Sequence, residues 1–202
     1  WSQSIVQFMS TRTYAFAVVL ATYLTGLFIG SSLMARRVDR LRDPWGIFAL
    51  LIAGAGLVAL LEIALLGRWL VLLQTQAETA VLALGGSVLL GMSARFAVAA
   101  LSIVFAPTLL LGAAFPVALR LCVGPGRVGR DVGAVVAFNT LGGIIGVALC
   151  GFVLIPWLGL VRTLGVLAII AAAVGFIAVR QGHGVKKGHR QGVIAVSLAA
   201  LL

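Results

Sequence analysis

Acidic residues are scarce in this chain of 202 residues. Only five are present, against 15 lysines and arginines, and charged residues of all kinds make up 10% of the sequence. A soluble domain carries about 25% charged residues and mixes both signs on its surface. The sequence therefore excludes a soluble enzyme, and its hydrophobic content of 62% predicts an integral membrane protein.

Residue patterns typical of catalysis or metal binding are also missing. Cys122 and Cys150 have no CxxC or Cys/His spacing, and we expect His183 and His189 to be solvated loop residues rather than ligands. Residues 124–129 match G-x-G-x-x-G but follow an apolar run instead of a strand, which predicts a turn. We expect no catalytic residue, metal or cofactor in these residues. Nucleic acid is not an expected partner, because the basic residues lie between apolar runs.

Five apolar runs are long enough to cross a bilayer, which takes about 20 helical residues. They cover about 14–35, 45–67, 96–119, 132–155 and 158–179. The sequence thus predicts an all-α membrane domain over 1–179, a bundle of five full transmembrane helices. We expect a basic cytoplasmic loop at 180–192 and the start of a further transmembrane helix at 193–202.

The distribution of positive charge favours one topology, because short cytoplasmic loops collect Lys and Arg. If 69–93 does not span, segments 36–43, 120–131 and 180–192 share one side and hold four, three and four of the 15 basic residues. If it spans, that bias vanishes, and Glu78 is placed near the bilayer centre at a cost of about 2.5–3.5 kcal/mol. We therefore expect 69–93 to be an amphipathic or re-entrant segment on the outer face.

The same topology makes the run at 14–35 cross from outside to inside. An even-numbered crossing therefore comes first, and we expect a further helix ahead of Trp1. The chain is interpreted as a piece of a longer protein.

Two pairs of glycines, Gly26 with Gly30 and Gly142 with Gly146, have small-xxx-small spacing. Each pair lies on one helix face and lets another backbone approach closely. We expect tight helix packing at both pairs. A sliding contact between moving helices is the functional alternative.

Pro107 and Pro116 lie in the third run. Each removes a backbone hydrogen bond and bends a helix. We expect hydroxyls such as those of Ser102 or Thr108 to satisfy the freed carbonyls. A kink for packing is the plain interpretation, and a hinge or cavity wall is the alternative.

Three polar residues inside the runs are candidates for a ligand path. Glu62 is the only acidic residue within a predicted span, and intramembrane carboxylates often mark function; alternatively it reaches water or pairs with Arg68. Asn139 and Thr140 lie about two turns inside the fourth run, where the amide needs a partner. An interhelical hydrogen bond and a ligand contact are the two interpretations.

Four strings follow one another along the chain, at residues 13–31, 107–116, 132–146 and 151–159. In their order and spacing they resemble the membrane domain of fused spermidine synthase-like proteins, and the resemblance covers most of residues 1–179. It implies a domain similar to half of a major facilitator transporter, ahead of a soluble domain of the aminopropyltransferase fold. That enzyme domain is not found in these 202 residues, so an aminopropyltransferase activity would belong to the parent chain.

The loop at 30–42 loosely resembles the facilitator motif between the second and third helices. In that motif an Asp-Arg pair helps latch the cytoplasmic side, a role that falls by resemblance on Asp39 and Arg40. The glycine usual between the paired basic positions is missing here.

The resemblance also implies a location and partners. It implies a multi-pass protein of the bacterial inner membrane, in contact with the lipid bilayer and with a C-terminal synthase-like domain of the same chain; self-association is left open. The domain would anchor the synthase-like domain and move its substrate or product. The alternatives are a purely structural anchor or oligomerisation module, and a stand-alone facilitator-type transporter.

Overall fold

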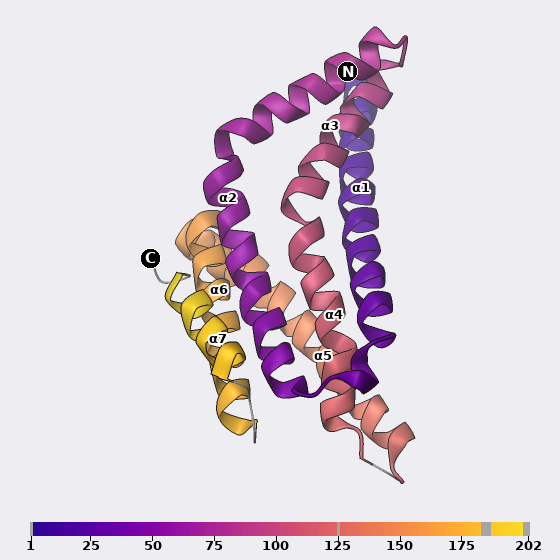
Figure 1. Cartoon of the computed structure of the whole chain (residues 1–202). Coiled ribbons are helices and arrows are strands. Elements are labelled where there is room, and N and C mark those ends of the chain that lie inside the picture. The colour runs from indigo at the N-terminus through magenta and orange to yellow at the C-terminus, as the bar shows by residue number, and fades with distance from the viewer. Residues whose placement is uncertain (1, 125, 183–186, 200–202) are drawn as a thin grey trace.

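The computed structural model describes residues 2–124, 126–182 and 187–199, which form helices joined by short turns and no strand (Figure 1). Within these described residues, four helical stretches are long and apolar enough to cross a membrane: Thr13–Ala35, Pro44–Glu62, Phe105–Cys122 and Val128–Gln181. The prediction of an all-α protein with membrane-spanning helices is confirmed. The count differs from the five spans expected, because the last two expected spans belong to the one stretch Val128–Gln181.

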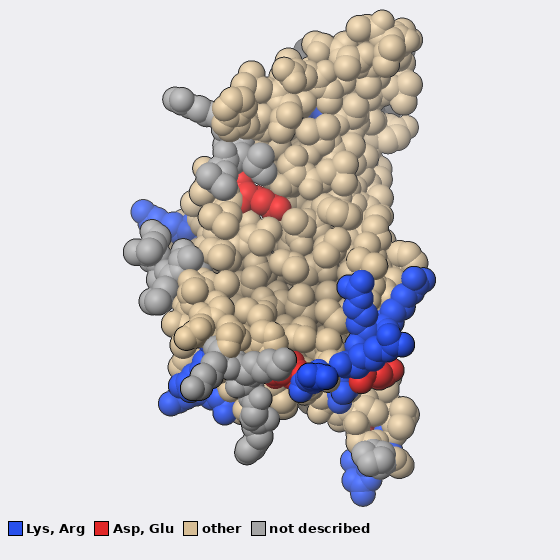
Figure 2. Space-filling model, viewed as in Figure 1, with Lys and Arg blue, Asp and Glu red and all other residues tan. Residues whose placement is uncertain are grey.

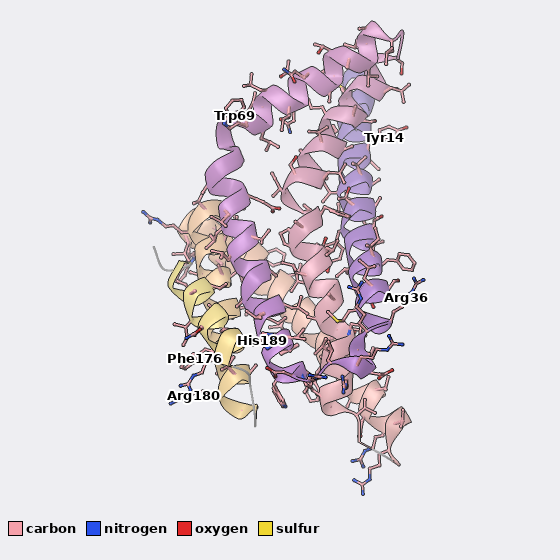
Figure 3. The ribbon with its side chains drawn as sticks, in the orientation of Figure 1. Tyr14, Arg36, Trp69, Phe176, Arg180 and His189 are labelled. Atoms are coloured by element: carbon pink, nitrogen blue, oxygen red, sulfur yellow. The ribbon has the colours of Figure 1, made fainter. Side chains whose placement is uncertain are left out.

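The first two long helices are α1 (Ser2–Ala35) and α2 (Pro44–Ala83). A short 3-10 helix, η1 (Val38–Arg40), lies in the connection between them. Asp43 begins α2 by accepting a hydrogen bond of 2.8 Å from the backbone N–H of Gly46, the usual N-cap interaction. Its 40 residues make α2 about 60 Å long, with a bend near Trp69 (Figures 1 and 3).

The third expected span, 96–119, is wrong, because it is divided between two helices. The structure has α3 (Val88–Ile103) and α4 (Phe105–Cys122) with a break at Val104. Pro107 lies in the first turn of α4, so the N–H that it lacks is the one that would have bonded the carbonyl of Ile103. The proline therefore ends α3 instead of kinking one long helix. Pro116 does lie inside a helix, α4.

The segment at 69–93 is a helical hairpin formed by the end of α2, a tight turn and the start of α3. Ser87 caps α3 by accepting a hydrogen bond from Leu90 N–H at 3.3 Å. Across the hairpin, Arg95 Nη1 lies 3.5 Å from Glu78 Oε2. The segment lies at the opposite end of the bundle from the α1–α2 connection (Figure 1).

The fourth and fifth expected spans, 132–155 and 158–179, belong to one helical stretch. It consists of α5 (Val128–Leu149), a short π-helix η2 (Cys150–Leu154) and α6 (Ile155–Gln181). At Gly159 the backbone has φ 76° and ψ 169°, a conformation open essentially to glycine alone. The chain turns there, so that α6 runs back antiparallel to α2.

Helix α1 packs along α4 through glycines. A Cβ on Gly30 would lie 2.9 Å from the backbone N of Ala113 and still closer to the carbonyl oxygen of Leu109, and a Cβ on Gly26 would overlap the hydroxyl of Thr108. Backbone-to-backbone approach of this kind is what small residues permit in membrane helices.

Helix α2 packs along α6 in the same way. A Cβ on Gly56 would lie 3.0 Å from the Cβ of Ala171, and one on Gly175 would lie 2.9 Å from the carbonyl oxygen of Ala49. The last helix, α7 (Lys187–Ala199), packs on both, with Val193 fully buried against them. Helix therefore covers much of the expected loop 180–192, and α7 begins before residue 193; residues 200–202 lie outside the described residues.

Candidate functional site

The described residues of three basic segments, 36–43, 120–131 and 180–192, lie at one end of the bundle (Figure 1), as the charge-based topology requires. Arg120 on α4 donates a hydrogen bond to the carbonyl of Val38 in η1. Figure 2 shows most Lys and Arg side chains toward this end; the surface above it is mostly uncharged, apart from one acidic patch near the middle and one basic group at the left edge. The structure shows that these basic residues cluster at one end, here called the basic end. That this end faces the cytoplasm stays a prediction.

A polar contact between Asp43 and His189 joins α7 to the start of α2 at the basic end. His189 Nδ1 lies 2.7 Å from Asp43 Oδ2, the Asp43 side chain is 5% exposed, and that of His189 is 29% exposed. Gly46 makes room for the pair, since a Cβ there would lie 2.8 Å from His189 Nδ1 and would overlap Asp43 Oδ2. The expectation that His189 is a solvated loop residue is therefore wrong; His183 lies outside the described residues.

A cavity of about 770 Å³ lies between α1, α2, α4 and α5. This volume falls within the roughly 300–1,000 Å³ of small-molecule sites. Helices α1 and α5 do not pack along each other in the described part of the chain, so the cavity is open on that side. Its aromatic and polar lining comprises Tyr23, Phe28, Ser31, Ser32, Phe48, Phe115 and Asn139, and apolar residues complete it.

Asn139 is the one predicted ligand-path residue that lines this cavity. Both Asn139 and its neighbour Thr140 are exposed, and the Thr140 hydroxyl donates to the carbonyl of Val136 in the same helix at 2.9 Å. Of the two, only Asn139 lines the cavity. Three further lining residues, Tyr23, Ser31 and Ser32, were not identified from the sequence. They are polar residues within the first apolar run, and that polarity could have marked them as candidates for a ligand path.

Glu62 lies on α2 away from the cavity lining. One of its carboxylate oxygens, Oε2, is buried and has no hydrogen-bond partner among the described residues. Such an oxygen is costly unless a donor or a cation reaches it. The alternative partner Arg68 has a side chain outside the described part of the structure.

Asp39 and Arg40 lie in η1 at the basic end, and both are exposed. No salt bridge found among the described side chains includes either residue. The latch role taken from the facilitator motif stays a prediction. The contact that does join distant segments at this end is His189 with Asp43.

The two glycine pairs have different surroundings. Gly26 and Gly30 meet α4, but a Cβ on Gly142 or Gly146 would meet no described atom within 4 Å. Large apolar side chains on the same helix are also uncovered, and Phe138 is 76% exposed. Packing at Gly142 and Gly146 thus stays a prediction that needs a partner beyond the described helices of this chain.

Apolar, aromatic and polar side chains therefore line one cavity between α1, α2, α4 and α5. Asn139, which the sequence had identified as a ligand-path candidate, is among them. No protein-family model matches this chain, and no curated protein or solved structure is significantly similar to it.

Proposed function

We propose that this chain is the membrane domain of a fused spermidine synthase-like protein, which anchors the synthase-like domain and moves its substrate or product across the membrane. The observation that carries the transport part is the cavity of about 770 Å³ within an apolar helical bundle. The volume lies within the range of small-molecule sites, and the hollow is partly open toward the surroundings of the bundle. A lined cavity that contains Asn139 is what a passage for a small molecule needs.

The lining of the cavity limits what such a molecule can be. The lining includes the aromatic residues Tyr23, Phe48 and Phe115, a residue type whose ring face binds an ammonium group with about 0.5–2 kcal/mol, but no charged side chain is among the lining residues. A polycation also needs carboxylates along its path. Within this proposal Glu62 supplies one carboxylate at a separate point, because its buried oxygen has no hydrogen-bond partner among the side chains that the structure describes.

A second candidate function, an anchor and oligomerisation module with no transported ligand, is favoured by α5. The glycine face of α5 and Phe138 are uncovered by the described helices. A second copy that packed on this face would give the glycines the close contact that such pairs usually make.

Flux through sealed vesicles separates these functions. Vesicles that contain the full-length protein are loaded with labelled spermidine or a labelled adenosyl compound, and release is followed over time. We expect Asn139→Leu to lower the flux at least tenfold, because it removes the amide from the cavity. Thr140→Val is the matched control, since its hydroxyl bonds its own helix, and its flux should equal that of the wild type.

Glu62→Gln tests the carboxylate separately from the cavity. The substitution keeps the shape of the side chain and removes the charge that would pair with a cation in a low-dielectric path. We expect it to abolish flux of spermidine while the thermal unfolding midpoint in detergent stays within a few degrees of the wild type. No flux from the wild-type protein, with Glu62→Gln indistinguishable from it, would establish the anchor instead.

A further inference from the structure

Four polar side chains line the cavity: Tyr23, Ser31, Ser32 and Asn139. In the part of the chain that the structure describes, none of these side chains has a hydrogen-bond partner. Four threonines of α1, α4 and α5 differ, because each donates its hydroxyl to a carbonyl of its own helix: Thr22, Thr25, Thr108 and Thr140. The cavity is therefore lined by polar groups that are still available to a bound molecule.

These groups lie inside membrane-spanning stretches. The tyrosine and the two serines belong to the span Thr13–Ala35, and Asn139 belongs to the span Val128–Gln181. An amide or hydroxyl without a hydrogen bond is costly in an apolar environment. Helices α1 and α5 do not pack along each other in the described part of the chain, so a molecule between them reaches the polar groups of both. A ligand with matching donors and acceptors would be stabilised there.

Charge distinguishes the two kinds of molecule that the proposed function considers. No residue of the described lining carries a charge, and an ion taken out of water without a counter-ion is strongly disfavoured. Spermidine carries several ammonium groups, and its proposed carboxylate partner, Glu62, lies away from the lining. An uncharged molecule has no such penalty. The lining therefore favours an uncharged adenosyl compound as the occupant of the cavity.

The residue types of the lining agree with a nucleoside. Aromatic residues, on which nucleobases stack, come from three of the helices: Tyr23, Phe28, Phe48 and Phe115. The amide of asparagine offers one donor and one acceptor to the N6 amine and N7 of adenine. Serine hydroxyls both donate and accept hydrogen bonds, as the hydroxyls of a ribose do. Aromatic residues, an amide and hydroxyls are thus the groups that a base and its sugar need.

We propose that the cavity binds an uncharged purine nucleoside, with Asn139 bonded to the edge of the base and Ser31 or Ser32 bonded to the sugar. This inference rests on the proposed function in one respect, since it names which of the two molecules occupies the cavity. The path of spermidine depends on Glu62 and is judged by its own assay.

Binding of labelled adenosine to the whole chain in detergent, measured by equilibrium dialysis, tests the proposal. We expect saturable binding, which Asn139→Leu weakens about tenfold because it removes a bidentate contact to the base. Thr140→Val is the matched control and should bind adenosine as the wild type does, since its hydroxyl bonds its own helix.

Purine riboside, which lacks the 6-amino group of adenosine, separates a contact of Asn139 from a merely structural role. The wild type should bind it about fivefold more weakly than adenosine, the effect of one hydrogen bond. Asn139→Leu should bind the two nucleosides equally. A variant that kept the preference for adenosine would show that Asn139 does not contact the amine, and would overturn the proposed contact.

Two exposed phenylalanines test the aromatic part of the lining. Phe28 is 72% exposed and lines the cavity, whereas Phe138 is 76% exposed and does not line it. Because both rings are largely uncovered, leucine at either position should leave the protein folded, which thermal unfolding verifies. We expect only Phe28→Leu to weaken adenosine binding, about fivefold, as loss of a stacking partner does. Equal effects of the two variants would contradict a base stacked in the cavity.

Two results would refute the nucleoside site outright: no saturable binding of adenosine up to its solubility limit, or displacement of adenosine by an equal concentration of spermidine. Flux through vesicles distinguishes this failure from that of the proposed function. Spermidine flux without adenosine binding would refute the nucleoside site and leave transport intact. Adenosine binding that depends on Asn139, without flux of either molecule, would support the site and refute transport.

Discussion

Alanine substitutions at Gly30 and Gly146 should change stability in opposite directions. Both glycines lie inside helices, and both are the second member of a small-xxx-small pair. The structure separates them, because a Cβ at Gly30 would lie 2.9 Å from Ala113 N and closer to Leu109 O, whereas one at Gly146 would meet no described atom within 4 Å. Gly30→Ala therefore forces α1 away from α4, and Gly146→Ala only improves helix propensity.

The sizes of the two effects follow from these contacts. Ordinary van der Waals contact with Ala113 N alone would require α1 to retreat by about 0.5–1 Å, and Leu109 O requires more; a gap of about 0.5–1 Å already forfeits roughly a quarter to a half of each contact energy. Overpacking of this kind costs about 1–3 kcal/mol. Alanine in place of glycine in an exposed helix gains up to about 1 kcal/mol. The two variants should differ by about 1–4 kcal/mol, or roughly 2–16 °C in unfolding midpoint.

Thermal unfolding of the whole chain in detergent, followed by circular dichroism, measures this difference. The wild type should fall between the two variants. If Gly146→Ala is as destabilising as Gly30→Ala, then the glycine face of α5 is covered in the folded protein, and a second copy or another helix packs there. If neither variant moves the midpoint, the close packing of α1 on α4 is refuted.

Three further predictions follow from the same structure. With the two native cysteines replaced by alanine, Ala77→Cys and Gly188→Cys should react with an impermeant reagent from opposite sides of the membrane, because the hairpin and the basic end lie at opposite ends; labelling from one side would contradict the topology. Gly46→Ala should push His189 from Asp43 and speed tryptic cleavage in α7, whereas Gly188→Ala, which meets no described atom, should not; equal cleavage would show that the contact does not hold α7. Gly159→Ala should cost about 1–3 kcal/mol in thermal unfolding, because an L-residue is strained at φ 76°, while Gly165→Ala should be neutral or stabilising; a harmless Gly159→Ala would refute the turn.

The lengths of the apolar runs were sufficient to predict a helical membrane protein. The distribution of Lys and Arg was sufficient to predict that the three basic segments lie at the same end of it. The hydrophobic effect and the exclusion of charge from lipid act on stretches of sequence, so composition alone reports them. The division of 96–119 was missed because a proline in a run predicts either a kink or a helix end. Only the position of Val104 outside regular helix shows that Pro107 ends α3.

The site was less predictable because it depends on contacts between distant residues. His189 and Asp43 are 146 positions apart, and nothing local to either residue indicates the other. Asn139 was identified from its polarity, but the cavity beside it exists because α5 diverges from α1, and spacing within α5 carries no information on that angle. The two glycine pairs have the same spacing, but which pair another helix approaches depends on residues far away in the sequence, so the spacing cannot distinguish them.

Because α2 is longer than a bilayer is thick, the two ends of the protein extend from the membrane in different shapes. At about 60 Å, α2 is twice as long as the hydrocarbon core is thick. Trp69, 66% exposed, lies at the bend at a height similar to that of Tyr14 on α1 (Figure 3), as aromatic residues do at a membrane interface. Beyond that level the end of α2 forms a tilted helical ridge, whereas the projection at the basic end is the narrower start of α5 (Figure 1). Electron cryomicroscopy in a lipid nanodisc would therefore reveal the orientation of each particle from the different shapes of its two ends.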